Sequence, residues 1–202
     1  PFYLAHPRLT RLERKMTGDV EGSNRNWQMR ILRHEAGHAI DSAYRLRRRA
    51  RWRALFGPAS RRYAQHYRVR PASRQHVQHL GEWYAQAHPT EDFAETFAVW
   101  LQPHSGWRRR YALWPARRKL EYVAEVAAEI GPLPPPVSNR ERIEALADST
   151  LTLREHYRRK RAAQRRQQRL LADSWLRRVF AEAQGASPGS PPAVALLRAH
   201  KP

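Results

Sequence analysis

The spacing of apolar residues predicts a long helix in the first third of the chain. From Trp27 to about Arg53, apolar residues recur at steps of three and four positions. Gly57 and Pro58 end this pattern, because both residue types are typical of turns. Residues 1–26 have a shorter, irregular pattern, and we interpret them as a leading segment. The apolar positions of the predicted helix are Met29, Leu32, Ala36, Ala39, Ile40, Ala43 and Leu46.

Two further helices are predicted downstream. Pro89 and Thr90 are typical of a helix start, and Pro103 ends the pattern that follows them. Another helical pattern spans about residues 116–130 and stops at Gly131. The apolar stripe of the first of these two helices consists of Phe93, Phe97, Trp100 and Leu101.

Prolines divide the chain into two parts. Three consecutive prolines lie within residues 132–139, and such a stiff segment cannot continue a helix. We therefore predict a domain over residues 1–131, a Pro-rich linker over 132–139 and a basic helical extension over 140–202. The extension is expected to contain a short helix near residues 141–147, a long one over about 151–184, and a disordered end.

The amino-acid composition limits the kinds of metal site and catalytic group that the chain can form. The chain has 202 residues, of which 41% are hydrophobic, and no apolar run is long enough for a membrane-spanning helix. It has no cysteine, which excludes disulfides, cysteine-ligated zinc, iron–sulfur clusters and a thiol nucleophile. Any metal must therefore bind through His, Asp or Glu. The chain opens with Pro1 rather than Met, so an N-terminal segment can precede it. Separately, we expect a cytoplasmic protein.

The charge is strongly positive. Lys and Arg number 38 against 18 Asp and Glu, a formal charge of +20, which favours anionic partners. Between Ser42 and Gly81 there are eleven arginines and no acidic residue, and residues 57–80 of this stretch have the composition of a long loop. An acidic peptide or another polyanion would suit this segment, and a solvated surface is the alternative. A second basic cluster over residues 158–169 is compatible with non-specific phosphate binding.

The first predicted helix carries an HExxH motif. His34 and His38 lie one turn apart on one helical face, where two imidazoles can bind one metal ion. Glu35 lies about 100° further round the helix, beside such a metal, where a base acting on metal-bound water is needed. The opposite face carries Leu32 and Ala36, which we expect to pack against the protein. A solvated amphipathic helix is the alternative interpretation.

A third ligand is expected from the second predicted helix. A metzincin would need Gly and His where this chain has Asp41 and Tyr44, so that class is excluded. Glu91 and Glu95 instead lie one turn apart at the start of the second helix. Glu91 as a ligand and Glu95 as the acceptor for the second N–H of a zinc-bound histidine would give a catalytic His₂Glu site. An acidic first turn favoured by the helix dipole is the alternative.

The motif His34-Glu35-Ala36-Gly37-His38 and the downstream segment of residues 91–98, EDFAETFA, resemble the bacterial family of "putative zinc-binding metallopeptidases", which belong with the gluzincins. The resemblance covers about residues 1–131. It implies an α+β zincin-like fold, mostly α in this chain, with a bound Zn²⁺ ion. No convincing strand is visible, so the sheet is expected in residues 57–80 or upstream of the chain.

One more residue is implied by a resemblance. Lethal-factor-type gluzincins have a tyrosine seven residues before the glutamate ligand, and Tyr84 stands seven before Glu91. Tyr84 is therefore a candidate for the reaction centre, and packing beside Trp83 is its alternative role.

Together these features predict a zinc metallopeptidase that hydrolyses peptide bonds. His34, His38 and Glu91 would bind the zinc ion, and Glu35 would activate the zinc-bound water. A peptide or protein is the expected substrate. The alternatives are a non-enzymatic, zinc-stabilised interaction module and a basic nucleic-acid-binding protein. The oligomeric state does not follow from the sequence.

Overall fold

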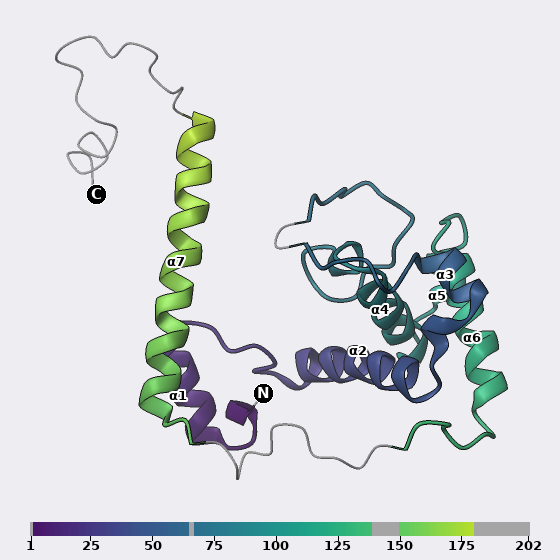
Figure 1. Cartoon of the computed structure of the whole chain (residues 1–202), viewed down its shortest axis with the longest axis horizontal. Helices are drawn as coiled ribbons and strands as arrows, with labels where there is room; N and C mark the ends of the chain where they lie inside the picture. Colours follow the sequence, from purple (N-terminus) through teal and green to yellow (C-terminus); the bar gives the residue numbers. More distant parts are fainter. Residues whose placement is uncertain (1, 65–66, 139–149, 180–202) are drawn as a thin grey trace. The chain divides into compact units, whose positions relative to one another are not determined.

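The computed structural model describes residues 2–64, 67–138 and 150–179, and the side chains of the last segment as far as residue 166. The chain divides into two compact units. The first comprises Pro1–Glu13 and Asp19–Ile143, and the second Arg14–Gly18 and Glu144–Pro202. Within the described ranges the structure is helical and has no β-strand (Figure 1). The mostly α prediction is thus confirmed, and the β part of the zincin-like prediction is not.

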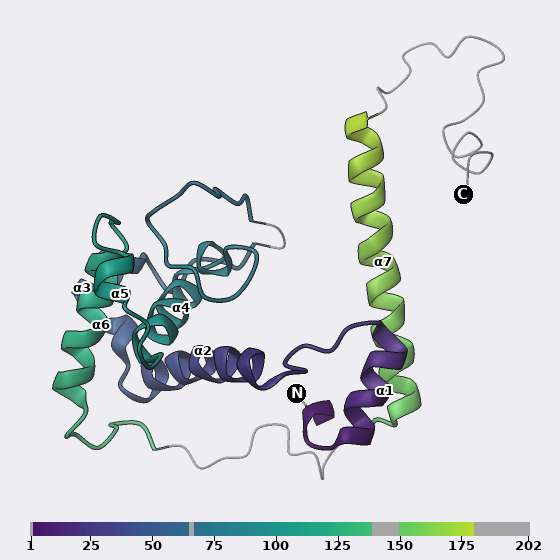
Figure 2. The same cartoon turned by 180° about the vertical axis from the view of Figure 1, so that it is seen from behind.

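The helices of the first unit follow the apolar pattern only in part. The predicted helices over 89–101 and 116–130 are confirmed as α4 and α6. The short leading segment contains α1, which includes its helix-like positions Leu9, Leu12 and Met16, and a short helix α5 follows α4 (Figure 2). The helices are α1 (Pro7–Thr17, shared between the two units), α2 (Arg25–Ala43), α3 (Ala50–Phe56), α4 (Pro89–Leu101), α5 (Trp107–Arg110) and α6 (Arg117–Ile130), with the 3₁₀ turns η1 (Phe2–Leu4), η2 (Leu46–Arg48) and η3 (Tyr84–Gln86).

The long helix predicted over 27–53 is interrupted. Its first part, α2, is capped by Asn24, whose side chain accepts a hydrogen bond from the Trp27 amide, and Tyr44 is the residue that caps its other end. Arg45 follows in the left-handed region at φ 52°, and helical structure resumes after it with η2 and α3. The buried carboxylate of Asp41 accepts a 2.8 Å hydrogen bond from the backbone N–H of Arg47 through Oδ1, and its Oδ2 forms an ion pair with Arg47 Nε at 2.8 Å. This local pairing holds the turn, and apolar spacing alone cannot reveal it.

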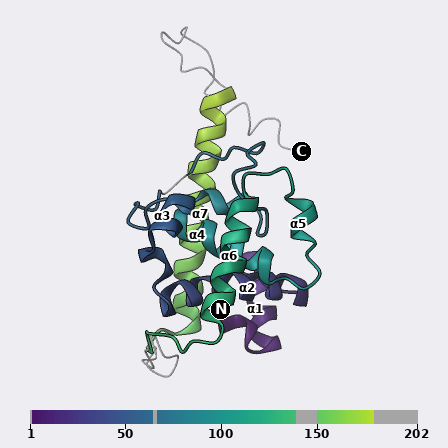
Figure 3. The same ribbon diagram turned by 90° about the vertical axis from the view of Figure 1, so that its right-hand side faces the viewer.

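Helix α4 is the centre of the first unit. All of its residues from 89 to 99 are buried, and it contacts α2, α3, α6 and η3. In Figure 3, α3, α4 and α6 lie close together, and each of them contacts the other two. One core cluster contains Phe93 and Phe97 of α4 with Trp52, Phe56 and Tyr122, and a second contains Val99, Trp107, Tyr111 and Leu120. The side chains of α4 are therefore held in place by elements on several sides of the helix.

The packing of α2 differs from the expected one. Leu32, predicted to pack, is 58% exposed, whereas His34 is only 3% exposed. Ala36 and Ile40 do pack against the larger core cluster. The face that carries the histidines is thus not solvated, because α4 covers it.

Part of the predicted linker is attached to the first unit. The Tyr44 hydroxyl donates a 2.7 Å hydrogen bond to the Leu133 carbonyl, and the Val137 amide donates to the Ala43 carbonyl at 3.2 Å. Residue 139, the last of the predicted linker, and the short helix expected near 141–147 lie outside the described residues. The domain boundary therefore stays a prediction.

In the second unit, the predicted long basic helix is present as α7 (Leu153–Val179). The Thr152 hydroxyl accepts a hydrogen bond from the Glu155 amide at its start. Glu155 then pairs with Arg158 and Arg159, which lie three and four residues later on the same helical face. The rest of the expected helix and the end predicted to be disordered lie outside the described residues. No helix that the structure describes is both long and apolar enough to cross a bilayer.

A buried ion pair joins α4 to α6. Lys119 Nζ lies 2.5 Å from Asp92 Oδ2, and Lys119 also donates to the Gln75 carbonyl at 2.8 Å. Burial raises the pKa of Asp92 to about 7, against the opposing effect of Lys119. His76 Nε2 also lies 3.7 Å from Asp92 Oδ2, but burial lowers the pKa of His76 to about 4, so this imidazole is neutral at pH 7. Without Lys119, the carboxylate of Asp92 would therefore have to remain buried without a cationic partner or bind a proton.

We therefore expect Lys119→Met to lower the free energy of unfolding by roughly 3 to 5 kcal/mol, as for other buried pairs that lose one partner. Urea denaturation at pH 7 measures this loss. The double variant Asp92→Asn with Lys119→Met is the control, and it should lose less than Lys119→Met alone because neither charge remains. Wild-type stability of the single variant would contradict the role given to this pair.

Candidate metal site

The structure brings together His34 and His38 of α2 with Glu91 of α4. Glu91 Oε2 lies 3.0 Å from His34 Nε2 and 3.1 Å from His38 Nε2, and the two imidazole nitrogens are 3.1 Å apart. The three residues come from two helices and from positions up to 57 residues apart. They are the one group of this kind found within the described residues.

The donor atoms fit a zinc ion. Bonds of about 2.0 to 2.2 Å to nitrogen and oxygen in a tetrahedral site place neighbouring donor atoms about 3.3 Å apart. The three separations of 3.0 to 3.1 Å form a nearly equilateral triangle close to this size. Three protein ligands leave the fourth position of the tetrahedron for water or substrate, as in catalytic rather than structural zinc sites.

The surroundings of His34 favour positive charge. Burial disfavours a charged imidazole, but the hydrogen bonds to Glu91 and Glu95 outweigh burial and raise the pKa of His34 to about 9. Despite its burial, hydrogen bonds from His34, His38 and Tyr63 hold the pKa of Glu91 well below its ordinary value. A divalent cation between these residues would supply the positive charge that the two carboxylates stabilise.

Glu95 lies behind His34, one turn after Glu91 on α4. Its Oε1 accepts a 2.8 Å hydrogen bond from His34 Nδ1, and its Oε2 accepts one from the Leu80 amide at the same distance. If a metal ion replaced the proton on His34 Nε2, the proton on Nδ1 would stay with Glu95 and the Nε2 lone pair would be directed toward the metal between Glu91 and His38. Glu95 thus links α4, α2 and the segment before η3.

A glycine allows the two helices to approach. A Cβ atom at Gly37 would lie 2.8 Å from the Ala94 Cα and 3.2 Å from the Ala94 carbonyl oxygen. Both are backbone atoms of α4, so no side-chain rotation could relieve the overlap. Because Gly37 lies between His34 and His38, and Ala94 between Glu91 and Glu95, this close approach of the helices lies at the metal-binding group.

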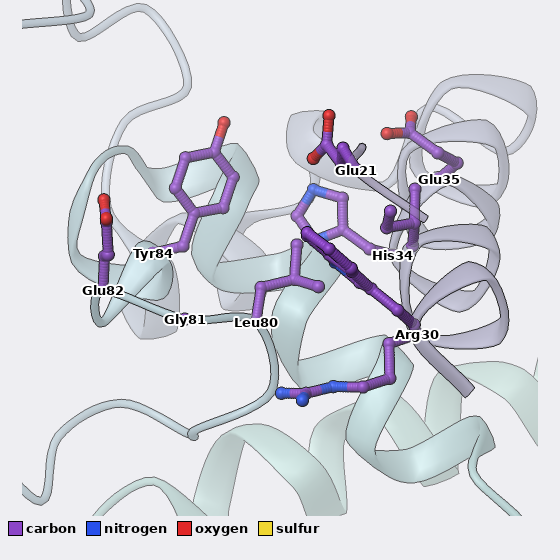
Figure 4. Close-up of a pocket in the computed structure, with 10 residues that line it drawn as sticks. Glu21, Arg30, His34, Glu35, Leu80, Gly81, Glu82 and Tyr84 are labelled. Atoms are coloured by element: carbon purple, nitrogen blue, oxygen red, sulfur yellow. The ribbon is translucent and has the colours of Figure 1, made fainter. Parts of the chain in front are cut away.

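A cleft of about 460 Å³ opens beside His34 (Figure 4). Glu35 lines it from α2, and Tyr84 faces it from η3 on the opposite wall. The centre of the Tyr84 ring lies 5.6 Å from that of His34. Burial and the nearby Glu91 raise the pKa of Tyr84 to about 12, which keeps its hydroxyl protonated. Glu35 and Tyr84 therefore lie on two sides of one open space next to the metal-binding group.

Tyr63 is a member of the site that the sequence did not indicate. Its hydroxyl donates a 2.7 Å hydrogen bond to Glu91 Oε1 and lies 2.6 Å from Thr90 Oγ1. Its ring stacks on His88 at 3.8 Å between ring centres. Tyr63 lies in a stretch without periodicity, 28 residues before Glu91, so no spacing rule identifies it.

Two other histidines have structural contacts. His88 caps α4 by accepting a hydrogen bond from the Thr90 amide, and its Nε2 lies 2.7 Å from the Arg61 carbonyl. His79 contacts the Arg30 carbonyl. The first unit is therefore a mostly helical domain in which two histidines and a glutamate form a candidate zinc site.

Residues 28–108 match the family described as "Putative zinc-binding metallo-peptidase". The match supports the resemblance noted in the sequence, over a shorter part of the chain than the expected 1–131. It includes most of α2 and all of α3 and α4, and thus every residue of the metal-binding group. No curated protein and no solved structure matches the chain.

The close approach of α2 and α4 at Gly37 can be tested by substitution. An alanine in place of a helical glycine ordinarily stabilises a helix by about 1 kcal/mol. At Gly37 we expect the opposite sign, a loss of roughly 1 to 3 kcal/mol from overpacking, together with weaker zinc binding as the helices separate. Calorimetric unfolding and zinc titration of Gly37→Ala measure both effects, and Gly81→Ala, which has open space around its Cβ position and no positive φ, is the control for glycine replacement as such. A Gly37→Ala protein with increased stability and unchanged zinc affinity would contradict the proposed packing constraint.

Proposed function

We propose that the first unit is a zinc-dependent metallopeptidase of gluzincin type, with His34, His38 and Glu91 as the ligands. The observation that supports this most directly is the convergence of these three donor groups beside a cleft that Glu35 lines. The family match supports a peptidase, and a peptide is the corresponding substrate class. A zincin-like relationship is supported by the two ligand-bearing helices rather than by a sheet.

Zinc in such a site supplies Lewis acidity, which polarises a carbonyl group and lowers the pKa of a coordinated water to about 7. Glu35 is the residue that transfers the proton of the attacking water. It follows His34 directly on α2, and its carboxylate is exposed to the cleft. We assign it as the general base that accepts the proton of the attacking water and then delivers it to the leaving amine.

Glu95 and Tyr63 are positioning residues in this mechanism. Glu95 fixes the tautomer and the ring orientation of His34 through Nδ1. Tyr63 holds the Oε1 atom of Glu91, which leaves Oε2 to face the histidines. Both residues act through a ligand and neither needs to touch the substrate.

Tyr84 is the proposed donor to the developing oxyanion. The peptide carbonyl gains negative charge as water attacks it, and a protonated phenol at the edge of the cleft can donate a hydrogen bond to that oxygen. The burial that raises its pKa to about 12 supports this role, because the hydroxyl keeps its proton at any physiological pH.

The test of the ligands and the base uses protein purified without immobilised metal. Elemental analysis should find about one zinc per chain, with a large reduction in His34→Ala and Glu91→Ala. Glu35→Gln should retain zinc and lose at least about 10²-fold in the hydrolysis of a mixed peptide library, since the amide cannot accept the proton. Glu125→Gln, on an exposed residue of α6, is the matched control. Zinc at full occupancy without any hydrolysis by the wild type would instead support an interaction module.

For Tyr84 the expected change is in turnover alone. Loss of one oxyanion donor typically lowers kcat about 10²-fold to 10³-fold. Tyr84→Phe should therefore reduce kcat to this extent and leave zinc content and thermal stability unchanged. Wild-type kcat in this variant would assign Tyr84 to packing against His34.

A further inference from the structure

A second cavity adjoins the cleft, and its lining is basic. It has a volume of about 580 Å³ and lies against α2, residues 78–79, the end of α4 and α5. Four arginines line it, and no Asp or Glu does. They are Arg25, Arg30 and Arg33 of α2 and Arg110 of α5.

These four guanidinium groups lack ion-pair partners within the described part of the chain. Arg47, Arg49 and Arg117 show the contrast, because each of them pairs with a carboxylate at 2.7 or 2.8 Å. In the part of the chain that the structure describes, none of the four arginines of the cavity forms an ion pair. A cluster of like charges that share one cavity without an internal counterion stabilises an external anion. Arginine also binds carboxylates in a bidentate manner.

The two cavities share part of their lining. Arg30 lines both of them, and the consecutive residues 78–82 form a wall that begins in the basic cavity and continues into the cleft. Figure 4 shows Arg30 at the end of the cleft away from Glu21 and Glu35. A ligand extended along this wall would therefore pass from one cavity into the other.

The charge changes sign along this path. The cleft is lined by Glu21, Glu35 and Glu82, which repel an acidic side chain close to the reacting atoms. The adjoining cavity has only positive charge among its ionised lining groups. The cleft disfavours an acidic side chain, and the basic cavity favours one. Together they would select peptides by the position of their acidic residue.

We propose that the basic cavity is a specificity site for an acidic side chain, Asp or Glu, of a peptide that occupies the adjoining cleft. This inference rests on the proposed peptidase function, since it takes the occupant of the cleft to be a peptide. A nucleic acid is less well matched. No Phe, Tyr or Trp lines the cavity to stack a base, and its neighbour along the wall is a cleft with three carboxylates.

The test measures binding rather than cleavage, so that it does not depend on turnover. The protein is the zinc-containing full chain with Glu35→Gln. The probes are fluorescein-labelled ten-residue peptides in which one Glu is moved through each position of an otherwise uncharged sequence, each with a Gln counterpart. Fluorescence anisotropy at 0.15 M salt should show at least about 10-fold tighter binding of the Glu peptide at one or two adjacent positions, and no preference elsewhere.

Matched charge variants locate the effect. Adding Arg33→Gln and Arg110→Gln should bring the affinity of the preferred Glu peptide to that of its Gln counterpart. Adding Arg11→Gln and Arg118→Gln, which changes the net charge equally at exposed positions outside both cavities, should leave the preference intact. Equal losses in both variants would show a general charge effect and overturn the proposal.

Three other outcomes also overturn it. These are equal binding of the Glu and Gln peptides at every position, absence of peptide binding, and binding of a twelve-nucleotide single strand that depends on Arg33 and Arg110 without any peptide preference. Failure of the proposed function is distinguishable from all of these. It would appear as absence of hydrolysis by the wild-type chain, whatever the binding preference of the Glu35→Gln protein.

Discussion

The arrangement of the first unit depends on how closely α2 and α4 approach each other. The ligands of both helices are needed to bind one metal ion, and their three donor atoms lie 3.0 to 3.1 Å apart where the two backbones come into near contact. Gly37 makes this possible, because any Cβ atom at that position would overlap the backbone of Ala94. The same approach places Glu95 against His34. A single missing side chain thus determines the distances among the other residues of the site.

The approach also requires α4 to be buried together with its charges. Glu91, Asp92 and Glu95 are all at most 5% exposed, and unpaired carboxylates in such positions are strongly destabilising. Each one has a partner from a different element: the histidines of α2 for Glu91, Lys119 of α6 for Asp92, and the Leu80 amide in addition to His34 for Glu95. These partners anchor α4 in one orientation.

The sequence predicted the parts of the site that depend on helical spacing. His34 and His38 recur at one turn on α2, and Glu91 and Glu95 do so on α4, so their relation within each helix follows from local geometry. Apolar spacing could not reveal the break at Arg45, which depends on the pairing of Asp41 with Arg47. Nor could it reveal Tyr63 or the basic cavity, because those contacts form between residues without any fixed separation in the sequence.

The irregular chain between α3 and α4 is joined to the site at several points. Tyr63 bonds to Glu91, the Arg61 carbonyl contacts His88, and the Leu80 amide bonds to Glu95. Coupling of this kind is reciprocal in free energy. A metal ion that fixes Glu91 and His34 would therefore also restrain this loop, and a peptide that orders the loop would raise the affinity of the site for its metal. In the proposed peptidase, metal retention and peptide binding would thus be coupled through the chain between α3 and α4.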